Sequence, residues 1–408
     1  MEGFGLGLED LPLQALRDAL VKDRETLTFG VEIKGAFATL DDCKADPHPD
    51  DPRNVLGITG REHNFMGIIS SAYAHVRKTL SEAGMLCQTS RSGLPFDWSP
   101  VENNLWVVKG DGSILPPDGP TRQTDEEVKQ TPFWFVGIEI NSPAYRFSPD
   151  TLDNVKKTCE VLRNTYRISC NRSCGLHVHV GNGDKGLSFR MTRNLYATLW
   201  EFEPQILEIH PFHRHENPYV RQFRVDSQMA VNLKKCNMNQ PKIGLNYLLY
   251  WTHSFTELGG RVMAAPNIAK MAYNTSNLLD GMEEFHVADC KKTIEFRQHK
   301  STLDPPRVMN WIRFCVGIVE FAGAVDDKVL AEFLQRHIDH TPGEFSIGKV
   351  LTALDMPDIS NYYKNNVIWQ REKDRLQLLK ERKAEDEEEP GARLIPTSSS
   401  PSIFEAPL

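Results

Sequence analysis

The stretch CGLHVHVG, Cys174 to Gly181, places two histidines two residues apart in an apolar run that ends in glycine. Side chains at positions i and i+2 of a strand share one face. His177 and His179 are therefore expected to point into the same space, while the apolar residues between them face the other way. Imidazoles arranged in this way are typical of a metal or phosphate site on the inner surface of a sheet.

Three other strand-like runs carry charged or polar side chains at the same spacing: TLTFGVEI with the following Lys34, FWFVGIEI with Asn141, and KKTIEFRQ with His299. β-Branched and aromatic residues favour a strand in each of them. The paired positions are Glu32 with Lys34, Glu139 with Asn141, and Glu295 with Arg297 and His299. We expect a sheet that holds these groups together.

A hard divalent ion such as Mg²⁺ takes carboxylate oxygens, water, substrate phosphates and an occasional imidazole. Glu32, Glu139, His177 and Glu295 on adjacent strands could supply that set. Arg297, two residues after Glu295, would then neutralise a transferring phosphoryl group beside the metal. A single Glu or Arg in a strand often makes only a structural ion pair, but four such strands in order favour a site.

The segments between these strands predict helices and one long loop. Ser148 to Tyr166 is expected to be helical, with Ser148 as N-cap and Pro149 at its first position. Further helices are predicted over Glu62–Ala83, Ser188–His210 and Pro305–Val325. Asp41 to Arg61 has no periodicity, and we interpret it as a loop that closes over the site as a lid.

Composition excludes some classes of function. The chain has 408 residues with 47 basic and 55 acidic side chains, which argues against non-specific nucleic-acid binding. No signal peptide opens the chain, no apolar run approaches the ~20 residues of a membrane span, and the scattered cysteines indicate reduced thiols. A cytoplasmic protein that binds neither nucleic acid nor membrane is predicted.

Two further groups could bind metal. Cys170 and Cys174 precede the histidines, but thiols four residues apart at the start of a strand would not face the imidazoles. The loop PFHRHEN contains His213, His215 and Glu216, a composition that is more common in a surface loop.

The ordered motifs resemble those of the amidoligase family, a branch of the glutamine synthetase and glutamate–cysteine ligase superfamily found in bacteria and fungi. The resemblance covers about three quarters of the chain, through FGVEI at Phe29, LWVVKGDGSI at Leu105, GIEINSP at Gly137, CGLHVHVG at Cys174 and IEFRQHKSTLD at Ile294. It implies an ATP- and Mg²⁺-dependent ligase that converts a carboxylate to an acyl phosphate, which an amine then attacks. The implied substrates are small molecules, and a fungal-type enzyme would serve specialised metabolism.

The resemblance also implies a fold and residue roles. The fold would be α+β, with a glutamine synthetase-like curved, mostly antiparallel sheet and helices on its outer face. Arg297 would bind phosphate, Asp111 would bind or deprotonate the amine unless it only forms an Asp-Gly turn, and the metal ligands would be Glu32, Glu139, His177 and Glu295. The catalytic domain would span residues 1–383, including helical arms at 1–25 and 341–383, with a disordered tail at 384–408.

One departure from the family pattern concerns the first strand. Its relatives carry GxExE, whereas Lys34 stands at the second acidic position here. Either Lys34 replaces a metal ion and contacts phosphate or a substrate carboxylate, or the site has lost a metal and the protein is a binding module. We favour retained activity, because the remaining site residues are present. A zinc-dependent hydrolase that uses His177 and His179 is a further alternative, although it would leave Arg297 without a role.

Overall fold

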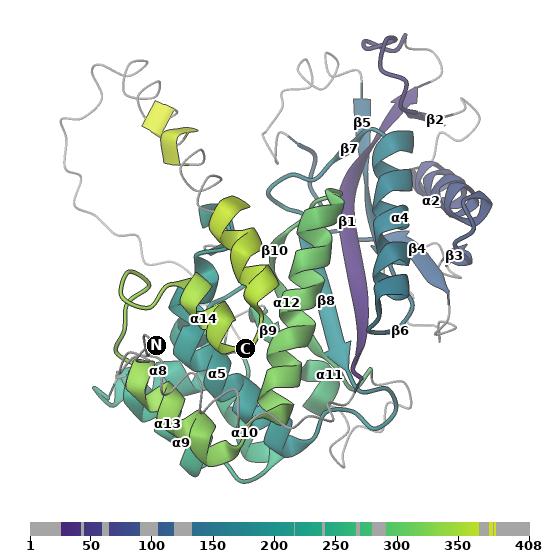
Figure 1. Cartoon of the computed structure of the whole chain (residues 1–408). Helices are drawn as coiled ribbons and strands as arrows, with labels where there is room; N and C mark the ends of the chain where they lie inside the picture. Colours follow the sequence, from purple (N-terminus) through teal and green to yellow (C-terminus); the bar gives the residue numbers. More distant parts are fainter. Residues whose placement is uncertain are drawn as a thin grey trace, which may run out of the picture.

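The computed structural model describes eleven segments of the chain: 26–41, 45–58, 65–89, 105–117, 133–215, 217–238, 241–266, 270–279, 291–366, 375–377 and 379–380. The predicted N-terminal arm at 1–25 and tail at 384–408 lie outside these segments. Within them, ten strands form one sheet with helices packed against it (Figure 1). The predicted α+β class with a mostly antiparallel sheet is confirmed.

The main path through the sheet runs in the order β3-β4-β5-β1-β8-β10-β9. Among the named strands of the described segments, only the β1–β2 and β3–β4 pairs are parallel. The strand bounds are β1 Thr28–Asp41, β2 Leu56–Ile58, β3 Cys87–Thr89, β4 Trp106–Gly110, β5 Phe133–Asn141, β6 Tyr145–Arg146, β7 Ile168–Ser169, β8 Gly175–Gly181, β9 Tyr273–Asn274 and β10 Ile294–Lys300.

Strand β1 is the central strand of the sheet. It pairs with β5 over Glu32 to Leu40 on one side, and with β8 over Thr28 to Ile33 and then β7 at Ala36 and Phe37 on the other. β6 and β2 pair with its two ends. The strand continues to Asp41, well past the predicted end at Lys34. Gly35 lies within this extension, and a Cβ there would come within 2.5 Å of Ile168 Cγ2, so the close approach of β7 requires glycine.

Helices α4 and α12 lie across one face of the sheet, and α5 packs against α12 (Figure 1). Ser148 caps α4 with its side chain, and Pro149 is its first residue, as predicted. The helix bounds are α2 Phe65–Glu82, α4 Pro149–Thr165, α5 Phe189–Leu207, α6 Phe212–His215, α7 Phe223–Asp226, α8 Gln228–Lys235, α9 Pro241–Tyr250, α10 Phe255–Val262, α11 Ser276–Leu279, α12 Pro305–Ala324, α13 Asp327–His337 and α14 Ile347–Ala353.

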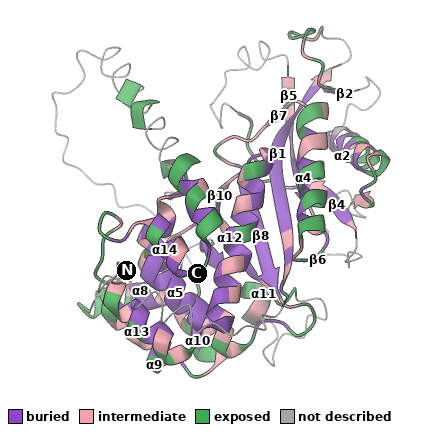
Figure 2. Ribbon diagram, in the orientation of Figure 1, coloured by how far each residue is buried: buried purple, intermediate pink, exposed green. Residues whose placement is uncertain are grey.

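The two faces of the central strands differ in chemistry. The apolar residues of β1 and β8 belong to the hydrophobic core that they share with α12 and α4, and both strands are buried (Figure 2). Because side chains alternate along a strand, the charged residues of β1 and β8 project from the opposite face. The fold therefore separates a dry face, covered by helices, from a polar face.

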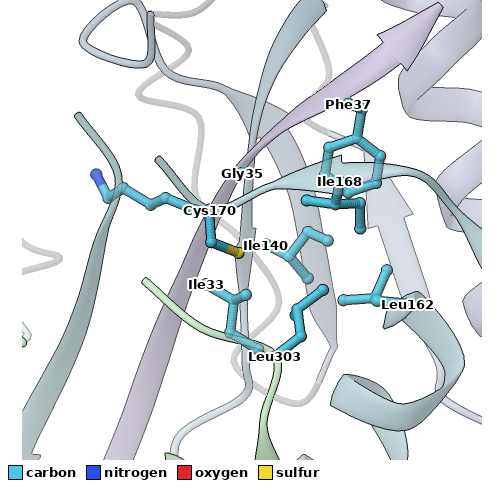
Figure 3. A pocket seen from close by; sticks show the side chains of 9 residues that line it. Ile33, Gly35, Phe37, Ile140, Leu162, Ile168, Cys170 and Leu303 are labelled. Atoms are coloured by element: carbon cyan, nitrogen blue, oxygen red, sulfur yellow. The ribbon is translucent and has the colours of Figure 1, made fainter. Parts of the chain in front are cut away.

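A small hollow lies on the dry face, between β1, β5 and α4 (Figure 3). Its labelled lining is apolar apart from the Cys170 thiol, and it is too small to hold a water molecule. Burial raises the pKa of that thiol to about 11, which keeps it uncharged. We interpret the hollow as a packing feature.

The segment predicted to be a lid lies at the far end of β1. β2 pairs in parallel with Thr39 to Asp41, about 17–23 Å along the strand from Lys34. The Arg167 guanidinium ties the segment down through two hydrogen bonds to the Asp46 carboxylate, of 2.7 and 2.8 Å, and one to the Asp51 carbonyl. This position of the described part of the segment does not favour a lid over the site, and the lid role of Asp41–Arg61 stays a prediction.

Candidate active site on the polar face of the sheet

Cross-strand pairing assembles the candidate site. Glu32 of β1 lies directly opposite His177 of β8, and His179 lies opposite Glu295 of β10. On the other side of β1, Lys34 lies opposite Glu139 of β5. The four predicted strands are therefore neighbours, and their polar residues form a continuous row.

Glu32 is the hub of this row. Nδ1 of His177 and Nε2 of His179 lie 2.9 Å from the two different oxygens of its carboxylate. Burial opposes ionisation, yet these hydrogen bonds and the charge on Lys34 hold the pKa of Glu32 well below its usual range. Glu32 is thus an ionised carboxylate in a largely buried place.

Glu295 completes the group on the other side of His177. One of its oxygens lies 3.0 Å from His177 Nδ1 and accepts a hydrogen bond from Arg297 Nη1, while the other accepts from Asn274 Nδ2 at 2.9 Å. Burial disfavours the charged form of Glu295, but the hydrogen bond from His177 and the nearby charge of Arg297 lower its pKa.

Glu32, His177 and Glu295 together could hold a metal ion. One potential ligand atom from each lies within 4.8 Å of the other two. Two carboxylates and one imidazole suit a hard or borderline divalent ion such as Mg²⁺ or Mn²⁺. The donor chemistry of these residues therefore fits the metal that the resemblance implies.

Glu139, the fourth predicted ligand, is held apart from this group by two lysines. Lys34 Nζ lies 2.7 Å from one of its oxygens, and Lys109 Nζ from β4 lies 2.9 Å from the other. Among the described residues, the group that could hold a metal does not include Glu139. Its role as a ligand stays a prediction, and in this arrangement it neutralises lysines.

Asp111 also faces Lys34. Its Oδ2 atom lies 2.5 Å from Lys34 Nζ, and its Oδ1 atom accepts hydrogen bonds from the backbone and the hydroxyl of Ser113. Burial alone would raise the pKa of Asp111, but Lys34 and Ser113 outweigh this effect and lower it. The Asp111 carboxylate is therefore a weak base. To bind or deprotonate an amine, Asp111 would have to release Lys34, and that role stays a prediction.

Arg297 is positioned by the backbone around it. Its Nε donates to the Tyr219 carbonyl at 3.2 Å, and its own carbonyl accepts from the buried Arg214 guanidinium at 2.8 Å. Arg214 also donates to the Gln298 carbonyl. Arg214, on α6, therefore braces the end of β10 and keeps the Arg297 side chain beside Glu295.

His299 does not share this face, contrary to the sequence prediction. The register between β10 and β8 shifts between Phe296 and His299, so His299 pairs with Leu176. Its ring lies against Trp311 of α12 in the core, with centroids 5.4 Å apart, and burial lowers its pKa to about 4. A β-bulge has moved it by one position, which reverses the face that it occupies.

Two glycines make room for the site. A Cβ on Gly175 would lie 2.7 Å from His177 Nε2, closer than real Cβ atoms approach. A Cβ on Gly137 would lie 2.8 Å from the Asp111 carbonyl, in the turn that carries Asp111 against β5. Both glycines belong to quoted motifs, and space for neighbouring groups explains why each is glycine.

The chain was compared with protein-family models, with curated proteins and with solved structures. The family model described as "Putative amidoligase enzyme" matches residues 25–319, which include every residue of the row. The chain belongs to this amidoligase family. The comparisons with curated proteins and with solved structures found no match.

Membership of the amidoligase family indicates an amide-bond-forming ligase that acts on small molecules. Within the part of the amidoligase chain that the structure describes, no helix combines the length and the apolarity needed to cross a membrane. The zinc site of Cys170, Cys174 and the histidines is not formed, because the described side chains bring only Glu32, His177 and Glu295 within metal-binding reach.

Sequence reasoning missed three side chains of the amidoligase site. Lys109 and Arg214 were quoted within motifs but given no role, and Asn274 lay outside every motif. The position of Lys109, two residues before Asp111 at the end of a strand, was a usable signal. Asn274 and Arg214 reach the site through tertiary contacts, which no local pattern encodes.

Proposed function

We propose that this amidoligase is an ATP-dependent carboxylate–amine ligase that forms its amide through an acyl phosphate. The observation that carries the proposal is the group of Glu32, His177 and Glu295 with Arg297 directly beside it. A buried set of metal ligands next to a guanidinium suits phosphoryl transfer, because developing charge on the phosphoryl oxygens needs positive groups on more than one side.

Each residue has a task in this reaction. Glu32, His177 and Glu295 would hold Mg²⁺, which when bound neutralises phosphate charge and orients the transferring group. Arg297 would contact the phosphoryl oxygens, and its brace to the Tyr219 carbonyl fixes the direction of approach. Glu139 and Asp111 would fix Lys34, and Asp111 would meet the amine if Lys34 moves toward the substrate.

A glutamine synthetase-like arrangement is part of the proposal. Helices cover one face of a mostly antiparallel sheet, and the polar row occupies the other face. ATP and both substrates would bind on that polar face. The side chains of Glu32, His177, Glu295 and Arg297 are only 4–14% exposed, which favours chemistry that excludes water from an acyl phosphate.

A binding module is the second candidate, because Lys34 occupies carboxylates that could otherwise hold cations. The two functions differ in turnover. We expect the ligase to release ADP from ATP and Mg²⁺ only when both carboxylic acids and amines are supplied. A protein that binds neither ATP nor Mg²⁺ in calorimetry, and shows no turnover, would overturn the ligase proposal.

Variants test the residues directly. Glu295→Ala and Arg297→Ala should reduce ATP turnover to below about one hundredth of wild type while the protein stays folded. Glu332→Ala and Arg313→Ala make the same chemical changes at exposed positions on α13 and α12, and should retain turnover. Wild-type turnover in either site variant would refute its assignment.

A further inference from the structure

A second cluster of carboxylates adjoins the proposed metal site, and a lysine stands at its centre. Lys34 Nζ lies 2.5 Å from Asp111 Oδ2, 2.7 Å from Glu139 Oε2 and 3.9 Å from Glu32 Oε2. The Lys34 side chain is only 9% exposed. Three converging carboxylates around one buried cation are an arrangement that proteins otherwise use for hard metal ions.

The charges in this cluster are balanced only while Lys34 is present. Asp111 and Glu139 carry two negative charges, and Lys34 and Lys109 supply two positive charges. A divalent ion that entered between these carboxylates would meet the ammonium group at contact distance, and like charges in a poorly hydrated space repel strongly. Glu32, at the edge of the cluster, is the one acid that also belongs to the proposed metal site.

We propose that Lys34 is a built-in cation that occupies a would-be second metal site, so that the protein binds a single divalent ion at Glu32, His177 and Glu295. Loss of the Lys34 charge creates a second divalent-cation site between Glu32, Asp111 and Glu139. This inference rests on the metal-binding part of the proposed function, and it adds the number of ions and the residue that limits it.

Lys109 provides a matched control. It also pairs with Glu139, at 2.9 Å, but its side chain is 33% exposed and Glu139 is the acid that it contacts in the row. If Lys109 is removed, Lys34 still stands between Asp111 and Glu139. A neutral residue at position 109 therefore leaves the second site closed, whereas a neutral residue at position 34 opens it.

The test counts Mn²⁺ ions bound to the full-length protein in the absence of nucleotide, by titration calorimetry and by electron paramagnetic resonance. We expect one ion in the wild type and in Lys109→Met, and two in Lys34→Met. Glu139→Gln added to Lys34→Met should return the number to one, and Glu295→Gln should remove the ion that the wild type binds. Two Mn²⁺ ions in close proximity also broaden each other's resonance, so the second ion has its own signature.

The possible results distinguish the inference about Lys34 from the proposed metal site. Two ions in the wild type, or one ion in both the wild type and Lys34→Met, would overturn the inference. No ion in the wild type and one in Lys34→Met would contradict the proposed metal site but support the role of Lys34. If Lys34→Met folds poorly, Lys34→Gln with and without Mn²⁺ gives the answer by thermal unfolding, since an added site raises the midpoint more in the variant than in the wild type. An equal rise in both would overturn the inference.

Discussion

Replacing Gly175 by alanine should disrupt the candidate metal group without touching any of its ligands. The added Cβ would lie 2.7 Å from His177 Nε2 and 3.1 Å from Arg214 Nη2. Ordinary contacts begin near 3.4 Å, so the imidazole must move by about 0.7 Å. It cannot move freely, because its Nδ1 atom is held by Glu32 at 2.9 Å and by Glu295 at 3.0 Å.

The size of the effect follows from opposing contributions. Overpacking of a tight interior costs about 1–3 kcal/mol, and a weakened buried hydrogen bond adds about 1 kcal/mol. Alanine also reduces the conformational entropy of the unfolded chain, which stabilises the folded protein by about 0.4–1 kcal/mol. The free energy of unfolding should therefore fall by about 1–4 kcal/mol. Mn²⁺ affinity should fall by about 10–100-fold because His177 is displaced.

Urea unfolding without metal and Mn²⁺ titration measure the two effects separately. Gly260→Ala is the control, because it lies in α10 and a Cβ there has no atom within 4 Å. It should stabilise the protein by about 0.5–1 kcal/mol and leave Mn²⁺ affinity unchanged. A Gly175→Ala protein as stable as wild type, with unchanged Mn²⁺ affinity, would refute the argument that space at this position sets the imidazole.

Two further predictions concern buried ionisable groups. Glu201 of α5 is 1% exposed, its oxygens have no hydrogen-bond partner among the described residues, and burial raises its pKa to about 9. The folded protein keeps the Glu201 proton up to about pH 9, whereas the unfolded chain loses it near pH 4.5. The free energy of unfolding should therefore fall as pH rises between these two values, by at most about 6 kcal/mol. Urea unfolding at several pH values should show this slope in the wild type and a flatter one in Glu201→Gln; equal slopes would contradict the assignment. Arg214→Lys should lower ATP turnover about 100-fold with the fold retained. A lysine cannot replace the planar guanidinium that donates to two carbonyls of β10, so Arg297 would shift by about 1 Å. Unchanged turnover would show that Arg214 does not position Arg297.

The sequence was sufficient to predict the polar face and its partners in outline. Alternation in β8 and in β5 is regular, so the faces of His177 and Glu139 follow from local pattern. Ser148 likewise predicts the start of α4, because an N-cap residue is recognisable from the local sequence. Neighbouring strands were inferred from shared chemistry, and the topology bears this out.

Other features depend on contacts that local pattern does not contain. The bulge in β10 moves His299 into the core, and no residue type in IEFRQHK marks it. The extension of β1 contains glycine and alanines, which have low strand propensity, yet pairing on both sides overrides that preference. The salt bridges of Glu139 to Lys34 and Lys109 arise from register between three strands, and register is a tertiary property.

The long stretch of sequence between β1 and β10 has a consequence for biosynthesis. The neighbours of β1 on the sheet are made much later, and Lys34 and Ser301, which are hydrogen-bonded in the folded protein, are 267 residues apart. At a ribosomal rate of 5–20 residues per second, about 13–50 s pass between the synthesis of β1 and that of β10. Until then β8 has an open edge and Glu32 lacks Glu295, so the nascent chain has neither a closed sheet nor a complete metal group. A ribosome that stops before residue 294 would release a chain in which β8 has one unpaired edge, and such fragments should depend on chaperones to stay soluble.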